Sequence, residues 1–187
     1  TMKYTNISDA VAAMKKLQQK QAAYNHAIGV LYLDATTVAP SDTWEGRGKT
    51  MEIMSQVTYE LIADPNNAEL FDYLSSHAEE LDNQTRRELE VLKKSFDQMH
   101  RIPAEEYVEY SVLLNDAQFI WEKAKNSNDF SIFAPYLEKI VAYNRKFAGY
   151  YNPSLSAYNA LLNEYEEGLT EDVLDAFFVQ LRSAIVP

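Results

Sequence analysis

The sequence predicts an all-α fold, a multi-helix bundle assembled from long helices. The 187 residues include only 5 glycines and 6 prolines, which indicates few turns and long elements. The strong helix formers Ala, Leu, Glu, Lys and Gln are abundant, and apolar residues recur at three- and four-residue spacings. No convincing pair of strands is present in the sequence. The length suffices for one sizeable core, so we expect a single domain over residues 1–187.

Composition and charge exclude several classes of function. The formal net charge of −11 argues against nucleic-acid binding, because phosphates need a basic face, and against binding to an anionic membrane surface. The absence of cysteine excludes a disulfide framework and a thiolate metal site. No apolar run approaches the roughly 20 residues that span a bilayer, and the first residues lack a signal-peptide core. We therefore expect a cytoplasmic protein.

The first helix is expected to begin at Asn6 or Ser8, either of which can cap it, and to run for roughly eight turns. Residues 30–33, the nearest strand candidate, are better interpreted as its end. The helical pattern breaks over residues 34–40, where consecutive β-branched residues are followed by Pro40. The apolar stripe of this helix consists of Val11, Met14, Leu17, Tyr24, Ile28 and Leu31.

A second helix is predicted over about residues 44–63, capped by Ser41 or Asp42 and stopped by the Asp-Pro-Asn-Asn sequence at 64–67. Its expected buried stripe is Met51, Met54, Val57 and Leu61. A short amphipathic helix follows, with Leu70, Phe71 and Leu74 on its apolar face.

The middle of the chain predicts three more helices. One begins at Asp82 or Thr85 and carries a coiled-coil-like seam, and the next starts with Pro103 and continues to about Ala124. A turn at residues 126–129 precedes a helix that starts near Pro135 and ends at Asn152-Pro153. The seam of the first of these helices consists of Leu89, Leu92, Phe96 and Met99. The second helix carries Tyr107, Leu114, Ala117, Trp121 and Ala124. The residues expected to face inward on the third are Leu137, Ile140, Val141, Asn144, Phe147 and Ala148.

Residues 156–169 form the most unusual stretch of the sequence. Tyr158 and Tyr165 lie seven residues apart and therefore share a helix face, and Gly168 is expected to end that helix. Three glutamates crowd the helix C-terminus, where the macrodipole disfavours acids. Such a conflict is expected at functional places, although an ordinary helix end with solvated acids is the simpler explanation. Thr170 caps a last helix with the apolar face Leu174, Phe177, Phe178, Leu181 and Ile185.

The histidines do not form a known metal motif. A hydrolytic zinc site on a helix needs two imidazoles at positions i and i+4, with a carboxylate base and a third ligand. The 3 histidines, His26, His77 and His100, include no such pair. A di-iron bundle would need two Glu-x-x-His pairs, and the sequence offers only Asp97-x-x-His100. We therefore expect no metal ligands in this chain and a surface position for His100.

Three segments together carry a resemblance to a known family. Residues 158–168 read Tyr-x-x-Leu-Leu-x-x-Tyr-Glu-x-Gly, and residues 128–141 resemble the helix that precedes such a segment. Residues 33–40, Leu-Asp-Ala-Thr-Thr-Val-Ala-Pro, are followed by Arg47. In order and spacing this pattern resembles the carboxypeptidase Taq family of metallocarboxypeptidases, whose turn reads Trp-Asp-x-x-Thr-x-x-Pro. Leu33 stands where that family usually has Trp, and Asn159 and Asn163 stand where it usually has Asp.

The resemblance implies that the chain is the N-terminal, all-helical part of a longer metallocarboxypeptidase. That parent would use zinc or cobalt, release amino acids one at a time from peptides with a free C-terminus, and act in the cytoplasm as a homodimer. Its His-Glu-x-x-His motif, whose glutamate activates the metal-bound water, would lie beyond residue 187. This segment would hold no catalytic residue and would form a wall and cover of the substrate groove.

The candidate residues of the groove each have two interpretations. Asp34, Thr37 and Arg47 form either a polar groove wall or a structural junction, in which Asp34 or Thr37 satisfies free backbone groups and Arg47 pairs with an acid. Tyr158, Tyr165 and Glu166 are likewise groove candidates. Structurally, the tyrosine hydroxyls would find a buried partner, and Glu166 could be that partner.

Two further possibilities concern the tryptophans and the whole chain. The rings of Trp44 and Trp121 are interpreted as core or groove lining. For the whole chain, the alternative to a peptidase part is a stand-alone helical protein-interaction module without enzymatic activity.

Overall fold

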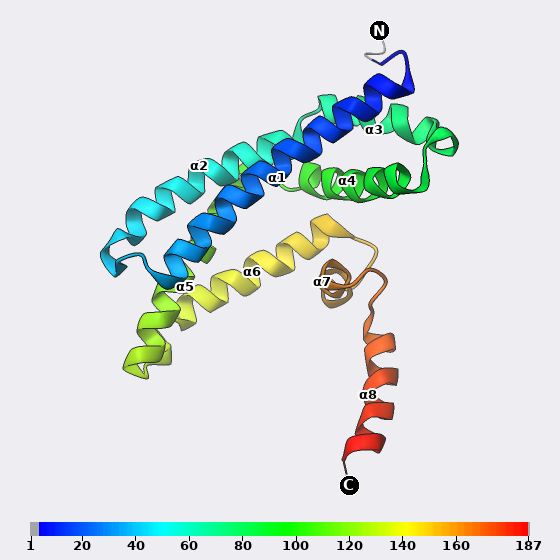
Figure 1. The fold of residues 1–187 in the computed structure, drawn as a ribbon. Coiled ribbons are helices and arrows are strands. Elements are labelled where there is room, and N and C mark those ends of the chain that lie inside the picture. Colours follow the sequence, from blue (N-terminus) through cyan, green and yellow to red (C-terminus); the bar gives the residue numbers. More distant parts are fainter. Residues whose placement is uncertain (1–3, 187) are drawn as a thin grey trace. The chain divides into compact units, whose positions relative to one another are not determined.

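The computed structural model describes residues 4–186, and within them the chain forms eight α-helices, three short 3₁₀ helices and no strand (Figure 1). The predicted all-α fold is therefore confirmed. The chain separates into two compact units, the first ending at Leu137 and the second beginning at Glu138. The single domain expected over residues 1–187 stays a prediction.

The helices follow one another with short connections. The α-helices are α1 (Ile7–Thr37), α2 (Trp44–Ala63), α3 (Asn66–Ser76), α4 (Asn83–Arg101), α5 (Ala104–Ser127), α6 (Ala134–Tyr151), α7 (Ala157–Tyr165) and α8 (Glu171–Ile185). The 3₁₀ helices are η1 (Ser41–Thr43), η2 (Ala78–Glu80) and η3 (Phe130–Ile132). The predicted bounds of α2 and the starts of α4 and α8 are confirmed.

The first helix is longer than the sequence pattern predicted. Asn6 caps it by accepting the backbone N–H of Asp9 at 2.8 Å, but the helix continues through Thr37. The Thr36 hydroxyl donates to the carbonyl of Tyr32 at 2.9 Å, and Thr37 donates to that of Leu33 at 2.5 Å. Because both hydroxyls bond inside the helix, the β-branched residues extend it, and the break predicted from residue 34 is wrong.

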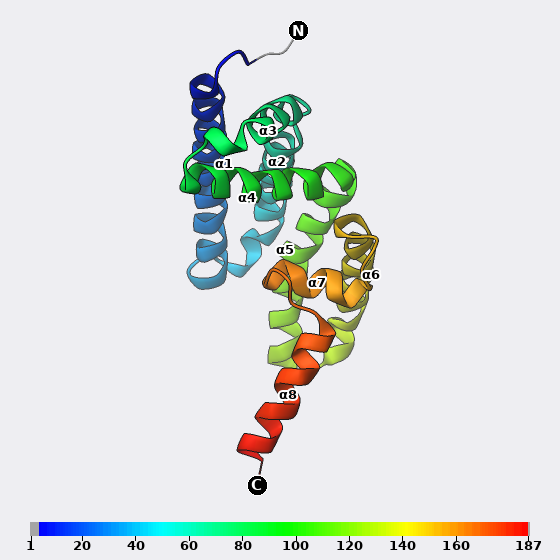
Figure 2. The same cartoon turned by 90° about the vertical axis from the view of Figure 1, so that its right-hand side faces the viewer.

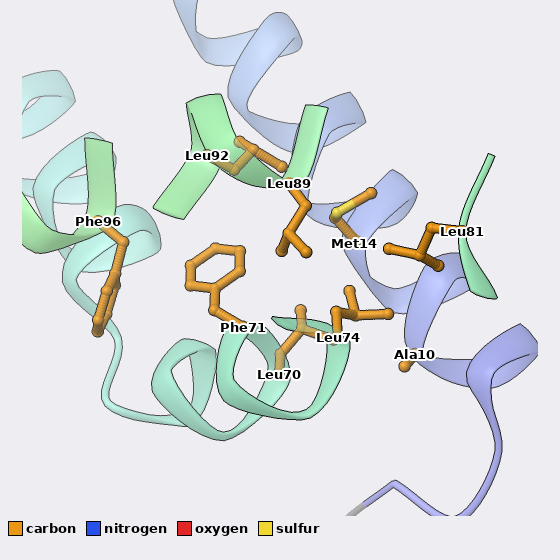
Figure 3. Close-up of a cluster of buried hydrophobic side chains, with 9 residues drawn as sticks. All are labelled: Ala10, Met14, Leu70, Phe71, Leu74, Leu81, Leu89, Leu92 and Phe96. Atoms are coloured by element: carbon orange, nitrogen blue, oxygen red, sulfur yellow. The ribbon is translucent and has the colours of Figure 1, made fainter. Parts of the chain in front are cut away.

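The core of the first unit lies where α1, α3 and α4 meet (Figure 3). Figure 2 shows α4 running across the direction of α1 and α2. The rings of Phe71 and Phe96 meet edge to face, with their centroids 5.4 Å apart. The predicted apolar faces of α3 and α4 are confirmed at the buried residues Leu70, Phe71, Leu74, Leu89, Leu92 and Phe96.

An ion pair links two of the helices that form this core. Lys15 of α1 pairs with Glu88 of α4, and the amides of Gln18 and Gln84 donate to the same carboxylate at 3.2 and 2.9 Å. These three hydrogen bonds hold the pKa of Glu88 below its usual value, and the bond from Lys15 is the largest cause. The ion pair therefore joins two helices that are far apart in the sequence.

Small residues, rather than the predicted stripe, form the buried face of α2. Met51, Met54, Val57 and Leu61 are only partly buried, whereas Gly48, Ser55 and Thr58 are buried. A Cβ atom on Gly48 would lie 3.4 Å from the side-chain nitrogen of Asn115 in α5, and the buried residues of α5 are Ala117 and Ala124. The fully buried residues of α2 and α5 are therefore small ones, and at Gly48 the backbone of α2 comes close to α5.

The predictions for the two ends of α2 had different outcomes. The cap predicted at Asp42 is wrong, because η1 leads directly into the helix and Thr43 holds the cap position without a side-chain bond. The side chain of Ser41, the other candidate, lies outside the described residues. The predicted stop is confirmed. The side chain of Asn67 donates to the carbonyls of Leu61 and Ile62 at 2.9 and 3.0 Å and so satisfies the free acceptors of the last turn.

Helix α5 also begins and ends differently from the prediction. Pro103 is its cap and not its first helical residue, and the helix continues three residues past Ala124. Asn128 then ends it in the left-handed region, with φ of 51°. Leu114 and Trp121 are 43% and 42% exposed, so neither side chain is part of a buried core. These two side chains belong to the cavity described below.

In the C-terminal half of α6, Phe147 and Ala148 are buried as predicted. The rings of Tyr143, Tyr150 and Tyr151 surround Phe147 with centroids 5.6 to 6.4 Å away. Leu137 and Val141 are 38% and 39% exposed, so their predicted inward position is wrong. The aromatic packing at Phe147 concentrates burial near the C-terminal end of the helix.

Helix α7 ends earlier than predicted. Glu166 already has extended backbone, so Gly168, with φ of 84°, belongs to the following turn and does not end the helix. The side-chain oxygen of Asn163 accepts the N–H of Gly168 at 2.9 Å, and that of Asn159 accepts the N–H of Glu171 at 2.8 Å. Both asparagines therefore hold the connection between α7 and α8.

The last helix, α8, begins as predicted, because the Thr170 hydroxyl accepts the N–H of Val173. Its apolar face is present but largely uncovered within the described residues. Phe177 and Phe178 are each 54% exposed and Ile185 is 67% exposed.

Candidate functional site

A cavity of about 700 Å³ lies between α1, α2 and α5 of the first unit. The C-terminal half of α1, the first three turns of α2 and most of α5 contribute to its lining. Its volume falls within the range of about 300–1,000 Å³ that is usual for small-ligand sites. Of the buried residues of α2, Ser55 contributes to this lining, beside larger residues such as Trp44, Arg47 and Met51.

Aromatic side chains form much of the cavity wall. Trp44 and Phe119 stack in parallel, with ring centroids 5.2 Å apart and an angle of 8° between the planes. Lys125 lies over the ring of Trp121, with its ammonium nitrogen 5.0 Å from the centroid. All four residues line the cavity. The wall therefore combines flat apolar surfaces with a positive charge.

Arg47 is the second cation of the lining, and neutral oxygens hold it in place. Its Nη1 donates to the Thr43 hydroxyl and to the carbonyl of Pro40, the latter at 3.4 Å. Its Nε is buried and has no hydrogen-bond partner. The predicted pairing of Arg47 with an acid is therefore wrong. Arg47 therefore lines the cavity as a cation that is not paired with any carboxylate of the described residues.

Neutral polar groups complete the lining. Burial raises the pKa of the Tyr107 phenol above its usual value. The Ser111 hydroxyl donates to the carbonyl of Tyr107 at 2.9 Å, and Ser55 is almost fully buried. The cavity thus offers hydrogen-bonding groups as well as charge.

The structure places only one of the predicted groove residues of the first unit on this cavity, namely Arg47. Asp34 and Thr37 lie in the last turn of α1, where both are exposed. The Thr37 hydroxyl is bonded to a helix carbonyl, and the carbonyl of Asp34 accepts the N–H groups of Val38 and Ala39 at 3.1 and 2.9 Å. A groove role for Asp34 and Thr37 stays a prediction.

The other three candidates belong to the second unit. Tyr158 is 56% exposed and Tyr165 is 91% exposed, and Glu166 is exposed as well. The alternative structural interpretation, in which the tyrosine hydroxyl finds a buried partner, is therefore wrong for Tyr165, whose side chain lies in solvent at the end of α7. Contact of these residues with a substrate stays a prediction.

Sequence reasoning missed part of the cavity. It identified Arg47 and anticipated a lining role for Trp44 and Trp121, but it did not single out Phe119 or Lys125. Only the packing of α2 on α5 brings Phe119 to Trp44. The seven-residue spacing of Leu114 and Trp121 marks one face of α5, and Lys125, four residues after Trp121, lies on the same face. No such spacing pointed to Phe119.

The model of the carboxypeptidase Taq (M32) metallopeptidase family matches residues 13–187. This chain belongs to the M32 family. Carboxypeptidase 1 of Bacillus subtilis (strain 168) is 33% identical over 171 residues, which make up 91% of this chain and 34% of that protein. The chain spans about a third of the length of the curated relatives it matches.

Solved structures agree with this assignment. The crystal structure of BsuCP has a TM-score of 0.90 and 32% identity, covering 96% of this chain and 36% of that chain. The M32 carboxypeptidase from Deinococcus radiodurans R1 has a TM-score of 0.78 and 27% identity over the same shares of the two chains. The resemblance stated from the sequence is therefore confirmed.

The family implies a divalent metal, but the described residues of this M32 chain do not fit one. Within residues 4–186 no three His, Asp or Glu side chains gather at distances that could hold an ion. His100 is exposed in the last turn of α4, as predicted, and Nδ1 of His77 lies 2.8 Å from the carbonyl of Tyr73.

Among the residues that the structure describes, no helix is long and apolar enough to cross a membrane.

Proposed function

We propose that this chain is part of a metal-dependent carboxypeptidase that releases C-terminal amino acids from peptides. The observation that carries the proposal is the similarity to Carboxypeptidase 1 of Bacillus subtilis, which extends over 91% of this chain but only 34% of that protein. The family match over residues 13–187 supports the same conclusion.

The contribution of this segment is a wall and cover of the substrate groove. The concave, aromatic surface between α1, α2 and α5 supports this role, as does the arginine on it. Asp34, Thr37, Tyr158, Tyr165 and Glu166 are the further candidates for substrate contact. The hydrolytic machinery lies in residues outside these 187, because the chain has only 3 histidines and none pairs at the required spacing.

The resemblance to the family suggests further properties of the whole protein. Zinc or cobalt is the proposed metal, the cytoplasm the proposed location and a homodimer the proposed assembly. Peptides with a free C-terminus are the proposed substrates.

The test compares the 187-residue chain with the protein encoded by its full reading frame. Both are supplied with zinc or cobalt and with a peptide bearing a free C-terminus, and the same peptide with an amidated C-terminus serves as the control. We expect amino-acid release from the free peptide by the longer protein only. We also expect no stoichiometric metal on the 187-residue chain, as measured by elemental analysis.

Two results would overturn the proposal. Metal binding and peptide cleavage by the 187-residue chain would show that its own residues suffice. A full reading frame without a His-Glu-x-x-His motif and without carboxypeptidase activity would favour the stand-alone interaction module.

A further inference from the structure

We propose that Arg47 is a positioning residue, which fastens the connection between α1 and α2 (residues 38–43) and so fixes the end of the cavity that these two helices border. This role differs from substrate binding, because the guanidinium is engaged by oxygens of the chain itself. The consequence for catalysis rests on the proposed groove role of this segment, whereas the fastening does not.

Burial does little to hold the connection between α1 and α2 (Figure 1). The side chain of Val38 is 77% exposed, and Pro40, Asp42 and Thr43 are exposed as well. A segment that buries so little surface gains little from the hydrophobic effect, so its local stability is low unless other interactions add to it. The hydrogen bonds of residues 38–43 therefore decide how well the connection is ordered.

The carbonyl oxygen of Pro40 is the acceptor on which these bonds converge. It accepts the backbone N–H of Thr43 at 3.1 Å and the Thr43 hydroxyl at 2.7 Å. Nη1 of Arg47 donates to the same carbonyl at 3.4 Å and to the hydroxyl oxygen of Thr43. The hydroxyl thus donates to Pro40 and accepts from Arg47, which joins the three residues in one network. Because the guanidinium is charged, its bonds are stronger than those between neutral groups.

The placement of Arg47 conflicts with two local preferences. Arg47 lies in the first turn of α2, where the helix macrodipole disfavours a positive charge. Its Nε is buried without a hydrogen-bond partner, which is unfavourable for a donor. The bonds from Nη1 to the connection offset these costs and hold the side chain in this orientation. Such a conflict between local preference and observed position is expected at functional places.

The connection joins two of the helices that line the cavity. Thr36 lines it from the last turn of α1, and Trp44 and Arg47 line it from the first turn of α2. Trp44 in turn stacks on Phe119 of α5. Arg47 therefore ties the connection to a helix that is itself packed against α5. The separation of the cavity walls at this end depends on that tie, because α1 reaches α2 only through residues 38–43 of the chain.

Limited proteolysis of the 187-residue chain with a broad-specificity protease tests the fastening. Arg47→Gln removes the charged donor, and Thr43→Val keeps the shape of the side chain but removes the hydroxyl. Each should make cleavage within residues 38–43 about tenfold faster, because loss of a charge-assisted hydrogen bond raises the population of the open segment by about that factor. Lys49→Gln is the matched control, since it removes a cation from an exposed position of the same helix that does not line the cavity. It should leave the cleavage rate unchanged.

Two readouts separate the fastening from a general loss of stability. Mass spectrometry of the fragments should place the new cuts within residues 38–43, whereas a general loss of stability would produce cuts along the whole chain. The double variant of Arg47→Gln and Thr43→Val should be cleaved more slowly than the product of the two single effects predicts, because both changes break the same network. A wild-type cleavage rate for Arg47→Gln, or independent effects of the two substitutions, would overturn the proposal.

The consequence for catalysis is measured in the protein encoded by the full reading frame, supplied with zinc or cobalt and a peptide with a free C-terminus. Arg47→Gln should raise KM several-fold and leave kcat unchanged, because a displaced wall weakens binding but leaves the hydrolytic groups in place. A variant that is merely less stable would lose active protein and so show a lower kcat at the same KM, which would overturn the positioning role. An inactive wild-type protein would contradict the proposed function, and the proteolysis would still decide whether Arg47 fastens the connection.

Discussion

Replacing Phe71 by alanine should be among the most damaging single changes to the first unit. Its side chain is 2% exposed and meets Phe96 edge to face at 5.4 Å (Figure 3). Burial of such a ring contributes about 1.5–3 kcal/mol, and the unfilled space left by its removal adds to the loss. We therefore expect a cost of about 3–5 kcal/mol, a large fraction of the usual stability of about 5–15 kcal/mol.

The assay is urea unfolding followed by far-ultraviolet circular dichroism. Phe130→Ala is the matched control, because that ring is 65% exposed, and it should cost less than about 1 kcal/mol. The Phe71→Ala and Phe96→Ala double-mutant cycle should give a coupling of about 0.5–1.5 kcal/mol, since the two rings touch. A Phe71→Ala loss no larger than that of Phe130→Ala would refute the reasoning.

Three further changes probe other parts of the first unit through the urea midpoint. Gly29→Ala should stabilise the chain by about 0.5–1 kcal/mol, because nothing lies within 4 Å of the new Cβ atom; a lower midpoint would contradict this. Tyr59→Phe should cost about 1 kcal/mol, because the carbonyl of Ile102 loses a 2.7 Å hydrogen bond; an unchanged midpoint would show that the bond does not matter. Glu88→Gln should lower the midpoint at neutral pH but not in acid. The Lys15 contact lowers the pKa of Glu88 in the folded chain, so its contribution is present above the ordinary glutamate pKa and is lost as the pH falls through the lowered one. An equal difference between wild type and variant at both pH values would argue against that linkage.

Local signals predicted much of the fold. The cap at Asp82, the stop at residues 64–67 and the cap at Thr170 each depend on a few neighbouring residues, and the structure has all three. The apolar faces of α3 and α4 followed from spacing, because these helices pack against a conventional core. Such features need no knowledge of which helices meet.

The errors arose where contacts between distant helices decide the outcome. The stripe of α2 was wrong because Gly48, Ser55 and Thr58 are its buried residues, whereas the larger residues of the predicted stripe are only partly buried. Local pattern also misplaced the end of α1, because it does not show that threonine hydroxyls can bond within the helix. Within the candidate site, resemblance identified Arg47, but only tertiary packing joins it to Phe119 and Lys125.

The connection between α7 and α8 has one more consequence. Asn159 and Asn163 each offer an oxygen to a backbone N–H, at positions where the family resemblance suggests aspartate. An aspartate would accept the same bonds but would lose its charge on acidification, whereas an amide does not titrate. The hydrogen bonds that these two amides accept therefore do not depend on pH. The connection between α7 and α8 keeps the same two acceptors at a pH where a carboxylate would become protonated.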